Sequence, residues 1–304
     1  MDVLVWFRIS LILFYLSAVE SLHEKLLFAN SQSIMEVDVN THKLTVLVGH
    51  GGSVVYSFDY DYENGYVYFP RFTFKDIVRF PYPSQNITLQ HVVNTSSYPA
   101  SIAVDSANGH IYWINDDQSN KLSRCNLDGT NVVVIFTTFN YALMLRLDVK
   151  NRWMYIGYFN KGISKSRFNL TETSMIANFQ SNSRVRTVGM DIDLTEQRIY
   201  WINYYGHIKS VNVDGSDVRT VISTSFPSLE YYALEVFESY IFYYTDDSKQ
   251  LVMRNKSQGS TPIVLYNSTN WIKGIYVFKS TGMLFKKRDE RCERDSQTHR
   301  STIN

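Results

Sequence analysis

Short strands rich in aromatic and β-branched residues recur along the chain at nearly constant intervals. Each strand has a large apolar residue at its third position, and these residues are Phe28, Phe69, Trp113, Ile156, Trp201 and Tyr244. Successive positions are 41, 44, 43, 45 and 43 residues apart. A fixed interval of this length is typical of repeat architectures, in which every repeat is one small structural unit.

Each repeat predicts four short antiparallel strands. An apolar strand ending in aspartate precedes the aromatic strand in four repeats, and these residues are Asp61, Asp105, Asp148 and Asp193. The Asn108–Gly109 pair suits the hairpin between two such strands. Asp-Gly turns at 128–129 and 214–215 come before the outermost strand, for example Val132–Phe136. Four antiparallel strands per unit of this length are typical of a propeller blade, whereas the helical periodicity of a solenoid is absent.

The two ends of the repeat array complement each other. The first aromatic strand, Leu26–Asn30, has no aspartate-ending strand before it, and an unmatched strand, Gly274–Phe278, follows the last repeat. The counts balance only if this C-terminal strand completes the first blade, which also removes two open sheet edges. The predicted fold class is therefore an all-β, six-bladed propeller closed by its C-terminal strand.

The N-terminus has the pattern of a signal peptide. Arg8 is the only charge between Asp2 and Glu20, and the run Ile9–Ala18 is short and apolar. An uncleaved membrane anchor is the alternative. We expect a signal peptide over 1–21, a propeller over 22–278 and a polar, mostly basic tail over 279–304. This organisation predicts a secreted or lumenal protein without a membrane span in its mature chain; the oligomeric state is left open.

Charge, cysteine content and sequons narrow the class of protein. The formal net charge of +1 gives no electrostatic support for a nucleic-acid partner. Two cysteines, Cys125 and Cys292, are too few for a disulfide framework, and pairing between them is left open. Five Asn-x-Ser/Thr sequons fit a secretory route and predict glycosylation at Asn86, Asn94, Asn169, Asn255 and Asn267.

Two repeats carry a family resemblance. Ile111–Asn115 followed by Asn126–Gly129, and Ile199–Asn203 followed by Asn212–Gly215, resemble the YWTD repeats of the low-density lipoprotein receptor class B family. Tyr231–Asp246 is similar to the last blade of such propellers, and the resemblance covers about residues 26–278. It implies an extracellular protein-binding domain like those of LDL-receptor-related proteins. Ligands of the family include Wnt-pathway proteins, lipoprotein-associated partners and basement-membrane proteins.

The chain departs from the family pattern at the last motif residue. This residue is Asp only at position 246; it is Asn at 30, 115 and 203, Arg at 71 and Tyr at 158. Family propellers are usually followed by a cysteine-rich EGF-like module, and here only Cys292 follows the last blade. The chain therefore resembles one propeller of a larger receptor, or a short secreted relative.

Candidate chemistry is sparse. The seven histidines have no metal-ligand spacing, and neither a Gly-x-Ser-x-Gly elbow nor a phosphate-binding glycine loop is present. The aspartates that end the inner strands are interpreted as turn caps, with calcium at the propeller axis as the alternative. We predict no catalytic residue, metal or cofactor. The alternative function is a metal-dependent propeller hydrolase.

One rim of the ring is the candidate site. Loops after the aromatic strands and connections between blades are expected on the same rim, where Tyr and Trp mix with charged residues as in protein-binding hot spots. The predicted ligand-binding residues are Asp116, Asp117, Tyr141, Tyr158, Arg184, Tyr204, Tyr205, Asp246, Asp247 and Trp271. A protein or peptide ligand is expected to bind there.

Overall fold

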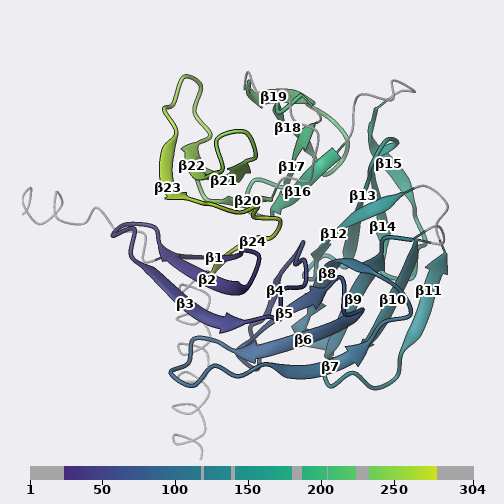
Figure 1. Cartoon of the computed structure of the whole chain (residues 1–304). Helices are drawn as coiled ribbons and strands as arrows, with labels where there is room; N and C mark the ends of the chain where they lie inside the picture. Colours follow the sequence, from purple (N-terminus) through teal and green to yellow (C-terminus); the bar gives the residue numbers. More distant parts are fainter. Residues whose placement is uncertain are drawn as a thin grey trace, which may run out of the picture.

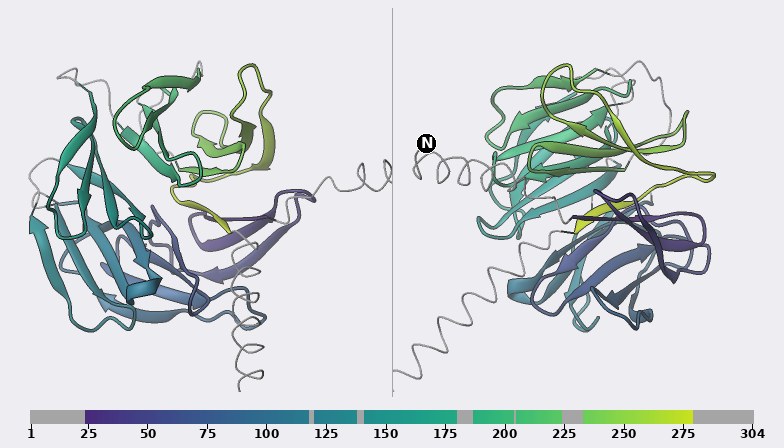
Figure 2. Two further views of the ribbon diagram at one scale, coloured as in Figure 1. Left: turned by 180° about the vertical axis from the view of Figure 1, so that it is seen from behind. Right: turned by 90° about the vertical axis from the view of Figure 1, so that its left-hand side faces the viewer.

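Six four-stranded antiparallel sheets are arranged as the blades of a ring (Figure 1). The computed structural model describes residues 24–117, 120–137, 141–179, 187–203, 205–223 and 233–278. The predicted all-β, six-bladed propeller is confirmed. Figure 2 shows the same ring from behind and from the side, with the sheets radiating from a common axis.

The first three blades come from the N-terminal half, apart from the innermost strand of blade one. From the axis outward, blade one contains β24 (Ile275–Phe278), β1 (Lys25–Ala29), β2 (Ser33–Asp38) and β3 (Leu44–Gly49). Blade two contains β4 (Asp59–Asp61), β5 (Tyr66–Arg71), β6 (Asp76–Pro81) and β7 (Gln90–Asn94). Blade three contains β8 (Pro99–Asp105), β9 (His110–Asn115), β10 (Lys121–Asn126) and β11 (Val133–Thr137).

The last three blades repeat this order without a crossover. Blade four contains β12 (Ala142–Asp148), β13 (Trp153–Tyr158), β14 (Gly162–Arg167) and β15 (Ser174–Asn178). Blade five contains β16 (Thr187–Asp193), β17 (Arg198–Asn203), β18 (Ile208–Asn212) and β19 (Arg219–Ile222). Blade six contains β20 (Leu234–Phe237), β21 (Tyr240–Thr245), β22 (Gln250–Asn255) and β23 (Ile263–Asn267).

The ring closes as the strand count predicts. Strand β24 pairs antiparallel with β1, so that Phe278 lies opposite Lys25 and Ile275 opposite Phe28. The backbone amide of Ala29 also donates a hydrogen bond of 3.1 Å to the carbonyl of Gly274. In Figure 1 the yellow-green end of the described chain accordingly lies beside its purple beginning.

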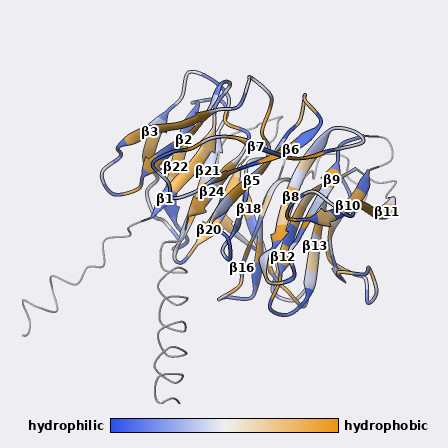
Figure 3. Ribbon diagram, turned by 90° about the horizontal axis from the view of Figure 1, so that it is seen from below, coloured by the Kyte–Doolittle hydropathy of each residue, from blue (hydrophilic) through white to orange (hydrophobic). Residues whose placement is uncertain are grey.

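Apolar cores fill the spaces between neighbouring blades. There are six clusters of buried hydrophobic residues in the described chain, one at each blade-to-blade contact. The aromatic strands supply their largest members, and the indole rings of Trp113 and Trp201 are at most 2% exposed. The interpretation of the Tyr-Trp pairs as core is therefore confirmed. Figure 3 shows hydrophobic residues concentrated in the strands and hydrophilic ones in many of the connections.

The aspartates that end the inner strands cap the following turns. The Oδ1 atoms of Asp61, Asp148 and Asp193 accept backbone N–H groups two or three residues later. Asp105 instead accepts a hydrogen bond from the side-chain amide of Asn108. It also forms an ion pair of 2.6 Å with Arg152. The connection after it is a 3-10 turn over Ser106–Asn108, closed by Gly109 at φ 68°. These carboxylates therefore have structural partners.

Neighbouring inner strands are joined around the axis by polar side chains. The hydroxyl of Ser57 accepts the amide of Ile102 at 3.0 Å, and that of Ser101 accepts the amide of Leu145 at 3.0 Å. Carboxylates act in the same way: Asp59 accepts Val104 N–H at 2.7 Å, and Asp191 accepts Val236 N–H at 2.8 Å. Because inner strands of different blades do not pair as one sheet, these bonds satisfy amides that would otherwise lack a partner at the axis.

Two glycines in blade three test how closely the blades pack. Both Gly109 and Gly129 have positive φ, at 68° and 86°. A Cβ at Gly109 would meet nothing within 4 Å, whereas a Cβ at Gly129 would lie 2.0 Å from the carbonyl oxygen of Val92 in blade two. We expect Gly109→Ala to cost about 1–2 kcal/mol and Gly129→Ala about 2–5 kcal/mol, because only the second adds a backbone clash to the strain.

Urea unfolding of the two variants measures this difference. Equal losses of unfolding free energy would show that the Asp-Gly turn of blade three does not press on its neighbour.

Several sequence expectations fall outside the described residues. They include the signal peptide over 1–21, the tail over 279–304, and Cys292. Cys125 is fully buried in β10, where burial raises the pKa of its thiol to about 12. In the described part of the chain, no helix is long and apolar enough to cross a membrane.

Candidate functional site

The two sets of loops predicted to share a rim do lie on one face, which we call the upper face. The amide of Asp116, after β9, donates to the carbonyl of Tyr98, just before β8. Likewise the amide of Phe159, after β13, donates to the carbonyl of Tyr141. The same link joins Ser268 to Lys249 beside blade six. In blades three, four and six, the loop after the aromatic strand is thus tied to an adjacent blade connection.

Exposed aromatic rings gather on this face. Five large rings with side chains 38% to 59% exposed lie in its loops, and we call them the aromatic rim: Phe74, Tyr98, Tyr141, Tyr205 and Trp271. They come from different blades around the ring. Burying such rings against a partner releases much apolar surface at a low cost in side-chain entropy.

Three of the rim rings also lie next to a cation. The guanidinium of Arg71 is 4.7 Å from the centre of the Phe74 ring, and the ammonium of Lys75 is 4.5 Å from that of Tyr98. Likewise, the ammonium of Lys273 lies 4.6 Å from the centre of the Trp271 ring. The rim therefore presents apolar rings together with positive charge.

The predicted residues of blades three and four have different environments. Tyr141 is the most exposed aromatic of the rim, and its amide is held at 2.9 Å by the side-chain oxygen of Asn120. Tyr158 is half-buried beside Lys161, so it offers less surface than predicted. Asp117 accepts the amide of Asn120 and shapes its own turn. Burial raises the pKa of the Asp116 carboxyl, and the nearby Asp117 adds to this effect.

The predicted ligand-binding residues of blades five and six also differ in exposure. Tyr205 and Trp271 belong to the aromatic rim, and Asp247 is exposed next to the half-buried Asp246. Arg184 and Tyr204 lie outside the described residues. The structure therefore brings Tyr141, Tyr205 and Trp271 onto one exposed face.

Sequence reasoning missed one member of the rim, Phe74, and it expected Tyr98 in a blade connection on this rim without including it among the predicted ligand-binding residues. Phe74 follows the proline-containing strand β5, which has a degenerate form of the repeat motif. A sequence signal for Phe74 was present, because two phenylalanines, Phe72 and Phe74, stand in a loop where polar residues are expected. Tyr98 stacks on Phe72 with ring centres 5.0 Å apart, so the two loops form one aromatic group.

The last motif residue of the aromatic strands shapes the upper loops. Asn30 accepts the amides of Gln32 and Ser33, and Asn203 accepts those of Tyr205 and His207. In blade two Arg71 replaces this pattern with a two-pronged pair to Asp76. The residue at this motif position thus determines which hydrogen bonds or ion pairs hold the following loop, while the aromatic strand itself is retained.

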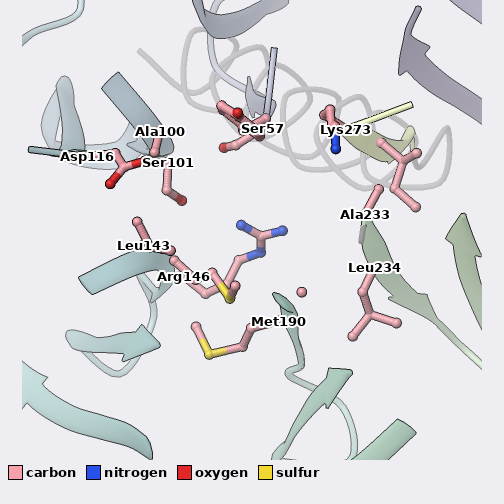
Figure 4. A pocket seen from close by; sticks show the side chains of 14 residues that line it. Ser57, Ala100, Ser101, Asp116, Leu143, Arg146, Met190, Ala233, Leu234 and Lys273 are labelled. Carbon is pink, nitrogen blue, oxygen red and sulfur yellow. The ribbon is translucent and has the colours of Figure 1, made fainter. Parts of the chain in front are cut away.

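The axis below the upper face is narrow and charged. Its upper cavity has a volume of only about 50 Å³, too small for an organic ligand. Figure 4 shows Arg146 near its centre, with Asp116 and Lys273 on opposite sides. A wider groove of about 770 Å³ runs beside Trp271 between blades six and one. A ligand on this face is therefore expected to contact the upper loops and the groove beside Trp271, and not the axial cavity.

A buried ion-pair group lies on the axis. Arg146 in β12 donates to Asp191 in β16 at 2.8 Å and to Glu235 in β20 at 2.9 Å. Burial lowers the pKa of Arg146, but the two carboxylates outweigh this and raise it overall. Burial also raises the pKa of Asp59, which borders the channel, to about 6.

The chemistry of these groups is that of structural support. Among the described residues, no three His, Cys, Asp or Glu side chains come together as metal ligands. The axial carboxylates point at Arg146 and at backbone amides instead. No observation in the described chain favours the hydrolase alternative.

The five sequons lie at the outer edges of blades two, four and six. Asn86, Asn94, Asn169 and Asn267 are exposed, and Asn255 is half-buried. All five are on or beside the two outer strands of their blades. None of the five is itself a member of the aromatic rim.

Comparisons with known proteins agree with the fold. No family profile matches the chain. A stretch of 172 residues, 54% of the chain, is 22% identical to the vitellogenin receptor of Solenopsis invicta, and it spans only 10% of that protein's length.

Solved structures match over most of the chain. A crystal structure of a nidogen/laminin complex superposes with a TM-score of 0.72 at 16% identity, over 84% of this chain and 98% of that one. The structure of putative TolB from Agrobacterium tumefaciens matches with a TM-score of 0.61 at 10% identity, over 84% and 97%. Together with the closed six-bladed ring, these matches show that the chain has the six-bladed propeller fold.

Proposed function

We propose that the protein is a non-catalytic recognition module that binds a protein or peptide ligand on its aromatic rim. One observation carries the proposal: five exposed aromatic rings lie in the loops of the upper face, while the described residues contain no group of three His, Cys, Asp or Glu that could hold a metal ion. Exposed apolar surface of this kind marks interaction sites. We further propose that the chain is secreted through residues 1–21 and glycosylated at its sequons.

The comparisons support a protein ligand. The matched nidogen structure is a complex with laminin, and the sequence relative is named a receptor. A laminin-like extracellular protein is thus the first candidate to test. A Wnt-pathway ligand, which the resemblance to LDL-receptor-related proteins implies, is the second.

Removing three rim rings should abolish ligand capture. We expect the triple variant Tyr141→Ala, Tyr205→Ala and Trp271→Ala to bind at least about 100-fold more weakly, because exposed aromatic anchors carry much of such binding energy. The measurement is a pull-down from native extracellular fluid, followed by the dissociation constant of the captured protein. The melting temperature should stay near that of the wild type, since all three rings are exposed.

Phe136→Ala is the matched control. Phe136 is 48% exposed, but it lies on the outer strand β11 and outside the rim. Its removal should leave capture unchanged. Undiminished capture by the triple variant would place the ligand on another surface.

A further inference from the structure

The groove beside Trp271 lies between the upper loops of blades six and one. Its volume is about 770 Å³, which is within the range of known ligand sites. Blade one contributes residues 29–31 and the connection 52–56 to its lining. Blade six contributes Lys249 and part of the connection 269–273.

The charge of this groove is positive. Among the described residues that line it, Lys249 and Lys273 are the only charged ones. Asp246 and Asp247 belong to the same loop as Lys249, but they do not line the groove. Lys249 is exposed, and Lys273 lies against the Trp271 ring and also lines the axial cavity (Figure 4). A concave site lined by one sign of charge focuses its field and favours a partner of the opposite sign.

The groove also presents apolar surface. The side chain of Trp271 is 51% exposed and that of Val54 is 36% exposed. A sulfated polysaccharide would leave this surface in contact with water, and the formal net charge of +1 gives no support for a nucleic acid. A peptide segment with both acidic and apolar side chains matches the two features together.

Both sides of the groove are held in place within the propeller. The carbonyl of Val54 accepts the amide of Phe72 in blade two at 2.9 Å. Across the groove, the carbonyl of Asn270 accepts the hydroxyl of Tyr244 at 3.1 Å. A site that is already formed loses less ordering entropy on binding. Because Phe72 also stacks on the rim residue Tyr98, the groove is joined to the aromatic rim.

We propose that this groove binds an extended acidic segment of the protein ligand. The inference rests on the proposed function and adds the chemistry of the ligand to it. Carboxylates of the segment face Lys249 and Lys273, and an apolar side chain covers the exposed parts of Trp271 and Val54. The partner is therefore an extracellular protein with a linear stretch of Asp or Glu that includes at least one large apolar residue.

Peptides selected on the full chain test this assignment. The probe is a displayed library of random peptides of about twelve residues, which span up to about 40 Å when extended. We expect the enriched peptides to carry net negative charge and a large apolar residue. The variant Lys249→Glu, Lys273→Glu should bind such a peptide about ten- to 100-fold more weakly in fluorescence anisotropy, because attractive charge contacts become repulsive. High salt should reduce this difference, since exposed charges are screened.

The variant Lys43→Glu, Lys150→Glu is the matched control. Both lysines are exposed, the change in formal charge is the same, and neither residue lines the groove. This control should bind the peptide like the wild type, and circular dichroism checks that each variant stays folded. Enrichment of neutral or basic peptides, or equal binding by the two double variants, would overturn the proposal. Binding of heparin without binding of any acidic peptide would overturn it as well.

Capture of the protein ligand separates this inference from the proposed function. The variant Tyr141→Ala, Tyr205→Ala changes two rim rings that do not line the groove. If this variant loses the ligand while Lys249→Glu, Lys273→Glu keeps the wild-type dissociation constant, the rim binds the ligand and the acidic segment is wrong. If the rim variant keeps the ligand, the proposed function fails, and the peptide experiment alone decides what the groove binds.

Discussion

Deletion of residues 271–278 is expected to unfold the propeller, whereas removal of the residues after Met283 should change the unfolding free energy by less than about 1 kcal/mol. Strand β24 has four buried side chains. Ile275 and Val277 pack against blade six, while Tyr276 and Phe278 pack against blade two. Burial of four such side chains is worth about 1.5–3 kcal/mol each, a sum comparable with the whole stability of a domain.

Thermal melting and protease resistance of the two truncations measure this difference. Val277→Asp supplies a milder variant, because Val277 is 1% exposed and a carboxylate there would be buried without a partner. Equal melting temperatures for the two truncations would contradict ring closure through β24.

Replacing Arg146 by methionine is expected to cost about 3–5 kcal/mol at pH 7, because it leaves Asp191 and Glu235 close together at the axis without their cation. The loss should shrink as the pH falls toward 5. Protonation removes the buried negative charges that Arg146 would otherwise neutralise, so lower pH favours the folded variant. Chemical unfolding at the two pH values measures the effect.

Two further variants make the interpretation specific. Adding Asp191→Asn and Glu235→Gln to Arg146→Met should recover most of the loss, since the uncompensated charges are then gone. Arg167→Ala breaks an ion pair to Glu172 whose side chains are 35% and 60% exposed, and should cost at most about 1 kcal/mol. If Arg146→Met lost no more unfolding free energy than Arg167→Ala, the axial ion-pair group would not support the ring.

The two faces of the propeller thus differ in character. The upper face offers exposed rings and a groove, with little volume at the axis. The opposite, lower face offers a cavity of about 470 Å³ that is lined by four carboxylates and two basic groups.

The repeat pattern alone determined the architecture. An interval of about 43 residues and the unmatched strand at the C-terminus were enough to predict six blades and their closure, because strand alternation and turn residues act locally. Boundaries shifted by about one residue: the closing strand begins at Ile275 and not at Gly274, and the first ends at Ala29 and not at Asn30.

The axial group shows what the sequence did not determine. Asp59, Arg146 and Asp191 each stand two residues before a turn-capping aspartate, a position that the repeat alignment could have shown to be charged. Their association still required the ring, because the ion pairs join strands 45 and 89 residues apart. Exposure of the rim residues was decided in the same way: Tyr141 and Tyr158 were both predicted to bind ligand, but the first is exposed and the second is half-buried. Local pattern fixes strands and turns, whereas contacts between distant blades decide which polar and aromatic side chains face the axis, a neighbour or solvent.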